Sequence, residues 1–125
     1  MIPKDLMYSK SHEWIKFTSE TTALVGLTDH AQQQLSDVVF VNLCDEDETF
    51  ATDDVIGDIE SIKAVSEMLS PVDGTVVKIN EDVLDTPEMI NSSPYEAWLV
   101  EFADITDKSQ LLSPEEYQDL IDSEA

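Results

Sequence analysis

Lys63 is the residue whose chemical setting stands out most in this sequence. The chain has only 6 basic residues against 28 acidic ones. Lys63 lies between two runs, 55–61 and 65–69, that have the apolar and β-branched residues of strands. These runs predict a hairpin with residues 62–64 at its tip. A tip exposes the ammonium while the paired strands hold its backbone, as a lysine-modifying enzyme requires. The pattern by itself also fits a surface lysine that balances nearby carboxylates.

The bulk composition excludes several function classes. A formal net charge of −22 would repel the phosphate backbone of a nucleic acid, so we expect no nucleic-acid partner. The single cysteine, Cys44, cannot form an internal disulfide. The only histidines of the sequence are His12 and His30, so it predicts no Cys/His zinc site and no other metal site. No nucleophile–base pair is visible, so we do not expect an enzyme. The acidic charge fits a protein kept monomeric by repulsion and equally one that docks on basic surfaces.

The sequence also bears on location. It contains no run of roughly 20 apolar residues, which is the length that a membrane helix needs. Residues 1–5 have neither the apolar core of a signal peptide nor an Arg-rich transit pattern. These features predict a cytoplasmic protein of bacterial type without a membrane partner. A mature mitochondrial form with an added methionine is left open.

Strand patterns alternate with turn signals over most of the chain. Further strands are predicted at residues 13–17, 22–28, 38–43, 75–80 and 98–102. Short helices are expected at 28–35 and 86–90. The first of them would begin either at Thr28 or with a capping box formed by Asp29 and Gln32.

Two of the predicted connections carry specific signals. In the stretch 70–74, the pair Asp73–Gly74 would supply a turn residue with positive φ. The acidic stretch 44–49 has the charge of a calcium-binding loop, but it lacks the Gly and the bidentate Glu that such a loop needs at fixed positions. We therefore interpret 44–49 as a solvated turn.

The end of the chain predicts a helix. Ser113 and Glu116 form a capping box with Pro114 between them at the first helical position. Many short strands with few helical periods between them are typical of a small β-sandwich or flattened barrel. No linker interrupts the pattern, so we expect a single domain over residues 1–125.

The segment around Lys63 is similar to one known family. Glu60–Ala64, followed by Ser70–Gly74, resembles the lipoylation motif of lipoyl carrier domains, and in particular that of the H proteins of the glycine cleavage system. Biotin carriers, the nearest relatives in shape, normally place Met on both sides of the lysine, where this chain has Ile62 and Ala64. Further segments that resemble H proteins follow in the order of the family: 8–14, 26–32, 38–41, 91–95 and 112–117.

The resemblance implies a hammerhead-like, lipoyl/biotinyl-type β-sandwich with short peripheral helices and a C-terminal helix. It implies (R)-lipoate joined to Lys63 by an amide bond, which removes the charge of the lysine and places a dithiolane on a flexible arm. The chain would be a monomeric, non-catalytic carrier that a lipoyl-attaching enzyme modifies. Its partners would be glycine decarboxylase (P protein, pyridoxal-phosphate-dependent), aminomethyltransferase (T protein, tetrahydrofolate-dependent) and dihydrolipoamide dehydrogenase (L protein).

The resemblance also assigns candidate roles to other residues. Ser11, Glu13 and Glu67 would line a cleft that binds the ammonium end of the loaded arm and shields it from water. The simpler alternative is that they are exposed polar residues near strand ends. Glu60 would either help the lipoyl-attaching enzyme to recognise the hairpin or simply be an exposed residue. Gly74 would be needed for the shape of its turn and would support the same recognition.

The sequence departs from the family pattern in loops away from Lys63. It has only 3 glycines, and Ser36 stands where the family has Gly, so we expect some turns to be built differently. The acidic residues 44–48 stand where the family usually has a loop that contains Pro and Gly. Two other functions stay open: an H-like protein that donates or relays lipoyl groups to other complexes, and an unmodified acidic interaction module.

Overall fold

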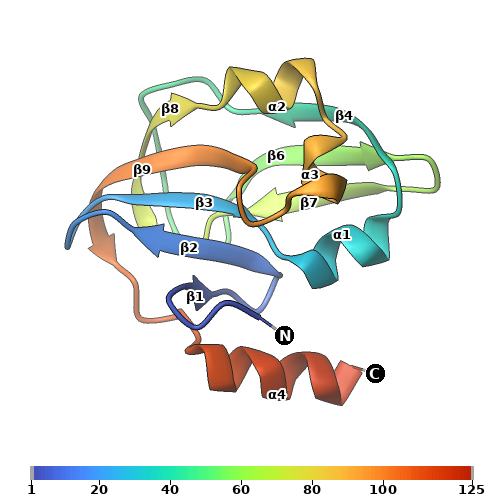
Figure 1. The fold of residues 1–125 in the computed structure, drawn as a ribbon. Helices are drawn as coiled ribbons and strands as arrows, with labels where there is room; N and C mark the ends of the chain where they lie inside the picture. Colours follow the sequence, from blue (N-terminus) through green and yellow to red (C-terminus); the bar gives the residue numbers. More distant parts are fainter. Residues whose placement is uncertain (1, 125) are drawn as a thin grey trace.

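The strands form two antiparallel sheets that face each other (Figure 1), in a computed structural model that describes residues 2–124. Along the six-stranded sheet the order is β1 (Met7–Tyr8), β2 (Glu13–Phe17), β3 (Ala23–Leu27), β9 (Trp98–Asp107), β8 (Asp73–Ile79) and β5 (Glu48–Phe50). The three-stranded sheet has the order β4 (Val38–Leu43), β6 (Val55–Ser61) and β7 (Val65–Leu69). The sheets do not close into a barrel, and the expected mainly β sandwich is confirmed.

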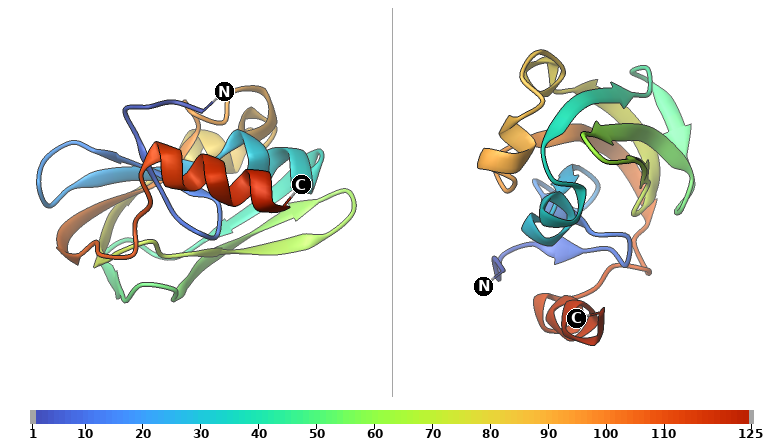
Figure 2. Two further views of the ribbon diagram at one scale, coloured as in Figure 1. Left: turned by 90° about the horizontal axis from the view of Figure 1, so that it is seen from below. Right: turned by 90° about the vertical axis from the view of Figure 1, so that its right-hand side faces the viewer.

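The helices lie around the sheets. They are α1 (Asp29–Leu35), α2 (Glu81–Asp85), α3 (Met89–Ser92) and α4 (Pro114–Glu124). Figure 2 shows α4 outside the sandwich. In Figure 1 and in the left view of Figure 2, the β6–β7 hairpin extends past α1 at one end of the molecule. None of the helices in the described part of the chain is long and apolar enough to cross a bilayer.

The core lies between the two sheets because side chains alternate between the faces of each strand. Its members include Ile15, Val25, Val100 and Phe102 from the six-stranded sheet and Val41, Ile59 and Met68 from the three-stranded one. In the three-stranded sheet, Val41 pairs with Ile59, and Ile59 pairs with Ser66, so this row faces the core. The neighbouring row, which contains Glu60, faces outward.

A second, smaller cluster attaches α4 to the sandwich. Tyr8 of β1 and Tyr117 of α4 stack with ring centroids 4.6 Å apart, and Trp14 and Leu6 are buried beside them. The predicted capping box at the start of α4 is confirmed, because the Glu116 N–H donates to Ser113 Oγ and the Ser113 N–H donates to the Glu116 carboxylate.

Several local predictions were wrong or incomplete. The two short strands β1 and β5 and the helix α2 were not predicted, because each is too short to show a periodic pattern of apolar residues. Strand β9 continues to Asp107, past the predicted end at residue 102. Thr28 caps α1 by accepting a hydrogen bond from the Ala31 N–H, whereas Asp29 accepts one from the side chain of Gln32.

The interpretation of Asp73–Gly74 as a turn with positive φ was also wrong. Both residues belong to β8, and no glycine of the described chain has a positive φ. Gly74 is needed for a different reason, since a Cβ there would lie 3.2 Å from the carbonyl oxygen of Ala103 and 3.2 Å from the ring of Phe102 on β9. The close approach of two strands therefore favours glycine.

The expectation that some turns are built without glycine is confirmed. Ser36 ends α1 with a φ of 65°, a value that glycine adopts most easily. Asp47, Asp53 and Asp104 also have positive φ, and Asp tolerates this region better than most residues. The scarcity of glycine thus changes the residues of the turns while the sheets keep their arrangement.

We expect Gly57→Ala to lower the free energy of unfolding by about 1–3 kcal/mol, because overpacking strains a paired strand. Gly57 lies in the middle of the three-stranded sheet, and an added Cβ would contact the backbone carbonyl of Asn42 and Cδ2 of Leu43. Urea unfolding measures the change. Ser66→Ala, an exposed change on the adjacent β7, is the control and should shift stability by less than about 0.5 kcal/mol. Equal stabilities for the two variants would contradict the close approach.

Candidate functional site

Ser61 fixes the turn that carries Lys63. Its hydroxyl accepts hydrogen bonds from the backbone N–H groups of Lys63 at 3.3 Å and of Ala64 at 3.1 Å. Its own N–H donates to the carbonyl of Ala64 at 2.8 Å. Ser61 was not among the predicted site residues, although a serine at the start of a short connection is a turn signal. The turn is therefore held by its own residues.

The tip of the hairpin is also tied to the body of the protein. The Ile62 N–H donates to the carbonyl of Asp37, between α1 and β4, at 3.0 Å. Lys63 is exposed, and within residues 2–124 the structure records no ion pair that includes it. Lys63 thus presents a free ammonium on an anchored backbone, and it does not neutralise Glu60 or Glu67.

Two exposed apolar side chains, with Glu60 between them, lie near Lys63 on the outer face of the three-stranded sheet. Phe40 pairs with Glu60, and Glu60 pairs with Val65, so the three side chains lie side by side on one face. Val65 is 63% exposed and Ile62 is 68% exposed. Exposed aliphatic and aromatic side chains grouped beside a reactive residue indicate a contact surface.

A cleft of about 320 Å³ begins beside Lys63 and lies between α1, β7 and the start of β2. Apolar side chains from β3, α1 and β6 form much of its wall: Leu27, Ala31, Leu35 and Ile59. The cleft is also lined by Ser11 and His12 from the turn before β2, by Glu13 at the start of β2, and by residues 64–67 of the hairpin. The structure thus brings all three residues predicted to dock the arm, Ser11, Glu13 and Glu67, to one cleft.

Glu13 is the buried charged group of this cleft. It is only 1% exposed, and its Oε1 accepts hydrogen bonds from the hydroxyls of Ser9 and Ser11, both at 2.5 Å. Its Oε2 accepts from the Leu69 N–H at 3.4 Å, so the carboxyl group connects β2 to β7. Burial raises the pKa of Glu13 to about 7, against the opposing effect of the serine hydrogen bonds. Glu13 is therefore not an exposed polar residue at a strand end.

Glu67 differs from Glu13 in its surroundings. It is exposed and pairs with Asp58, whereas its neighbour Ser66 pairs with the core residue Ile59. Because successive side chains of a strand point to opposite faces, Glu67 belongs to the outer face and contributes only to the rim of the cleft. Ser66 was not among the predicted site residues, although it lines the cleft and lies in the row of β7 that faces inward. Gly74 lies outside the cleft and the hairpin.

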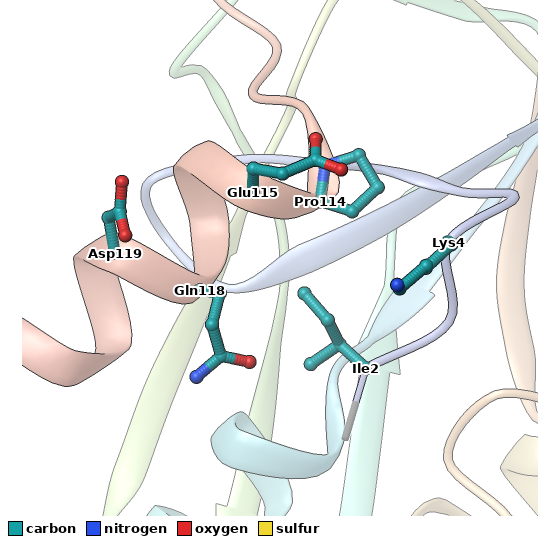
Figure 3. A pocket seen from close by; sticks show the side chains of 6 residues that line it. All are labelled: Ile2, Lys4, Pro114, Glu115, Gln118 and Asp119. Atoms are coloured by element: carbon teal, nitrogen blue, oxygen red, sulfur yellow. The ribbon is translucent and has the colours of Figure 1, made fainter.

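Another hollow, of about 350 Å³, lies between the N-terminal segment and α4 (Figure 3). Ile2, Lys4 and Pro114 line it, together with polar residues on the surface of α4. Figure 3 shows its carboxylates, Glu115 and Asp119, well apart on successive turns of the helix. The hollow has no convergent set of polar groups and no residue of the hairpin, so we assign it no ligand.

Comparison with known proteins identifies the family of the chain. The family model described as "Glycine cleavage H-protein" matches residues 6–124. The glycine cleavage system H protein of Lachnoclostridium phytofermentans is 53% identical over 121 residues, which cover 97% of this chain and 95% of that protein. The H protein of Herpetosiphon aurantiacus is 45% identical over 125 residues, with coverage of 99% and 96%.

A solved structure gives the same answer. The crystal structure of a glycine cleavage system H protein from Mycobacterium marinum superposes with a TM-score of 0.90 at 35% sequence identity, and the match covers 97% of this chain and 99% of the other. The resemblance found in the sequence is thereby confirmed over nearly the whole chain. The chain belongs to the glycine cleavage H-protein family, whose members are non-catalytic carrier subunits of the glycine cleavage system.

Proposed function

We propose that Lys63 carries (R)-lipoate in an amide bond and that the cleft beside it holds the loaded arm. The family is one of lipoyl carriers, and the feature that supports this residue is an exposed lysine on a turn anchored by Ser61. Lys63 occupies the lysine position of the motif Glu60–Ala64. Its free ammonium and fixed backbone suit both attachment by an enzyme and later presentation to several active sites.

When bound, the lipoyl group would carry the aminomethyl group of glycine from the pyridoxal-phosphate-dependent decarboxylase to the tetrahydrofolate-dependent aminomethyltransferase and would then be reoxidised by dihydrolipoamide dehydrogenase. The chain itself supplies positioning, since the reactive chemistry belongs to cofactors. Tethering at Lys63 raises the effective concentration of the arm at each docked enzyme. The extended position of the hairpin leaves space for these partners (Figure 2).

The residues of the cleft fit the chemical parts of a loaded arm. Leu35 and Ile59 offer an apolar wall to the alkyl chain. Ser11 and Glu13 lie where an ammonium end would find a carboxylate and a hydroxyl partner. The described part of the chain records no cation paired with Glu13, so an arriving ammonium would provide the opposite charge that this buried group lacks.

Glu60 is the candidate for recognition by the lipoyl-attaching enzyme. It lies between Phe40 and Val65 on the outer face, within reach of any protein that approaches Lys63. A carboxylate between two exposed apolar side chains gives such a protein a charged anchor inside a hydrophobic contact. Gly74 would act indirectly, because it lets β8 approach β9 closely.

Intact mass spectrometry tests the attachment site. After expression with lipoate and a lipoyl-attaching enzyme, we expect the chain to gain the mass of one lipoyl group and Lys63→Arg to gain none, since Arg offers no amine for amide formation. Lys16→Arg, at an exposed position of β2, is the matched control and should keep the gain. An unmodified parent chain, or a modified Lys63→Arg chain, would refute the proposal.

A reconstitution then separates the glycine cleavage role from that of a lipoyl donor. The lipoylated chain is mixed with the decarboxylase, the aminomethyltransferase, the dehydrogenase, glycine, tetrahydrofolate and NAD. Glycine-dependent formation of NADH supports the carrier role. If no NADH forms and the lipoyl group is instead transferred to an acceptor domain of another complex, the chain is a lipoyl donor and not a carrier of glycine cleavage.

We expect Glu13→Ala to shorten the lifetime of the loaded arm by roughly tenfold or more, because a hydrogen bond to a charged group contributes about 1.5–3 kcal/mol. Glu67→Ala should have a smaller effect in the same direction, because Glu67 lies at the rim. The measurement is the release of formaldehyde and ammonia from the loaded protein after removal of the decarboxylase.

Two controls accompany this measurement. Glu48→Ala, on β5 and away from the cleft, should leave the rate of release unchanged. All the variants should accept lipoate as the parent does, which separates arm docking from attachment. The same release rate in the parent and in Glu13→Ala would rule out a docking role for the buried carboxyl group.

A further inference from the structure

Three side chains from distant parts of the sequence converge beside α4. His12 comes from the turn before β2, His30 from the first turn of α1, and Glu124 from the last turn of α4. We infer that His12, His30 and Glu124 form a binding site for a divalent transition-metal ion of the zinc type. The site does not involve Lys63, and its existence does not depend on the proposed function.

The distances between the three ligand atoms suit such an ion. The Oε1 of Glu124 lies 3.2 Å from Nε2 of His12 and 3.4 Å from Nε2 of His30. Atoms bound at about 2.0–2.1 Å around a tetrahedral zinc ion lie roughly 3.3–3.4 Å from one another. All three potential ligand atoms lie within 4.8 Å of each other.

His12 is already held in the orientation that a ligand needs. Its Nδ1 lies 2.8 Å from the hydroxyl of Tyr117, which in turn lies 2.7 Å from Oγ1 of Thr28. With Nδ1 as the donor, the lone pair of Nε2 faces Glu124. Metal-binding histidines commonly donate their second N–H to a fixed partner in this way.

His30 supplies an independent indication. Its Nε2 is buried and makes no hydrogen bond within the described chain, and its contact with Glu124 at 3.4 Å is an ion pair only when the imidazole is protonated. A buried polar atom without a partner destabilises a protein by about 1–3 kcal/mol. Coordination of an ion shared with Glu124 and His12 would satisfy this atom.

The donor set identifies the class of ion. Two imidazole nitrogens and one carboxylate oxygen favour zinc and its first-row neighbours over Mg²⁺ and Ca²⁺, which take oxygen ligands. Three protein ligands leave a fourth position for water or another group. Because Glu124 belongs to α4, a bound ion would attach the end of this helix to α1 and to the turn that contains Ser11 and leads into Glu13.

The test uses the full chain after treatment with a chelator, at pH 7.5. Titration calorimetry with ZnCl2 should show one equivalent bound, and thermal unfolding should show a higher Tm with one equivalent of zinc. CoCl2 should give the visible absorption of tetrahedral cobalt. Glu124→Gln and His30→Gln should each weaken zinc binding at least tenfold. Neither change lies in the core of the sandwich, so both variants should fold.

Two controls separate this site from the general attraction of an acidic protein for cations. Asp122→Asn, an exposed change in the same helix, should bind zinc as the parent does. MgCl2 should raise the Tm far less than ZnCl2 at equal concentration. Equal zinc affinity in Glu124→Gln and the parent, or equal effects of the two salts, would overturn the proposal. Absence of saturable zinc binding would also overturn it. The contacts of the two histidines with Glu124 would then be ordinary ion pairs of protonated imidazoles.

Discussion

The packing of the three-stranded sheet on the six-stranded sheet is the contact on which the rest of the structure depends. Ile15, Val100 and Phe102 meet Val41 and Ile59 in one apolar layer. Because neither sheet closes, the edge strand β7 faces the start of β2 without backbone pairing between them, and the side chains there leave the cleft. The apolar layer thus holds the hairpin in place and also sets the position of the cleft in which we propose that an arm on that hairpin docks.

Glu13 is a buried carboxyl group at the edge of this packing, where it also lines the cleft. A carboxyl group in an apolar layer destabilises the fold unless its oxygens are bound, and here two serine hydroxyls and one backbone N–H bind them. Those donors hold it without neutralising it. A positive ligand would supply the opposite charge that these donors do not, which is consistent with the proposed cleft for an ammonium-bearing arm. An apolar residue would pack as well but would bind nothing.

The C-terminal helix shows how one element serves two purposes. Tyr117 stacks on Tyr8 and anchors α4 to β1, while its hydroxyl bonds to His12 and Thr28. The residues at the start of β2 therefore take part in both features. Glu13 and its neighbour His12 line the cleft, and His12 also belongs to the histidine cluster. Any ion or proton bound between His12 and Glu124 acts on the same short turn that positions the residues of the cleft.

The sequence by itself determined the features that depend on neighbouring residues. The hairpin around Lys63 and the capping box at Ser113 could be predicted because strand patterns and caps are local, and the ordered motifs identified the family. Only the tertiary structure decided which face each side chain occupies. The burial of Glu13, the place of Glu67 at the rim and the meeting of His30 with Glu124 depend on strand register and helix docking. Those arise from contacts between residues far apart in the chain, which no local pattern records.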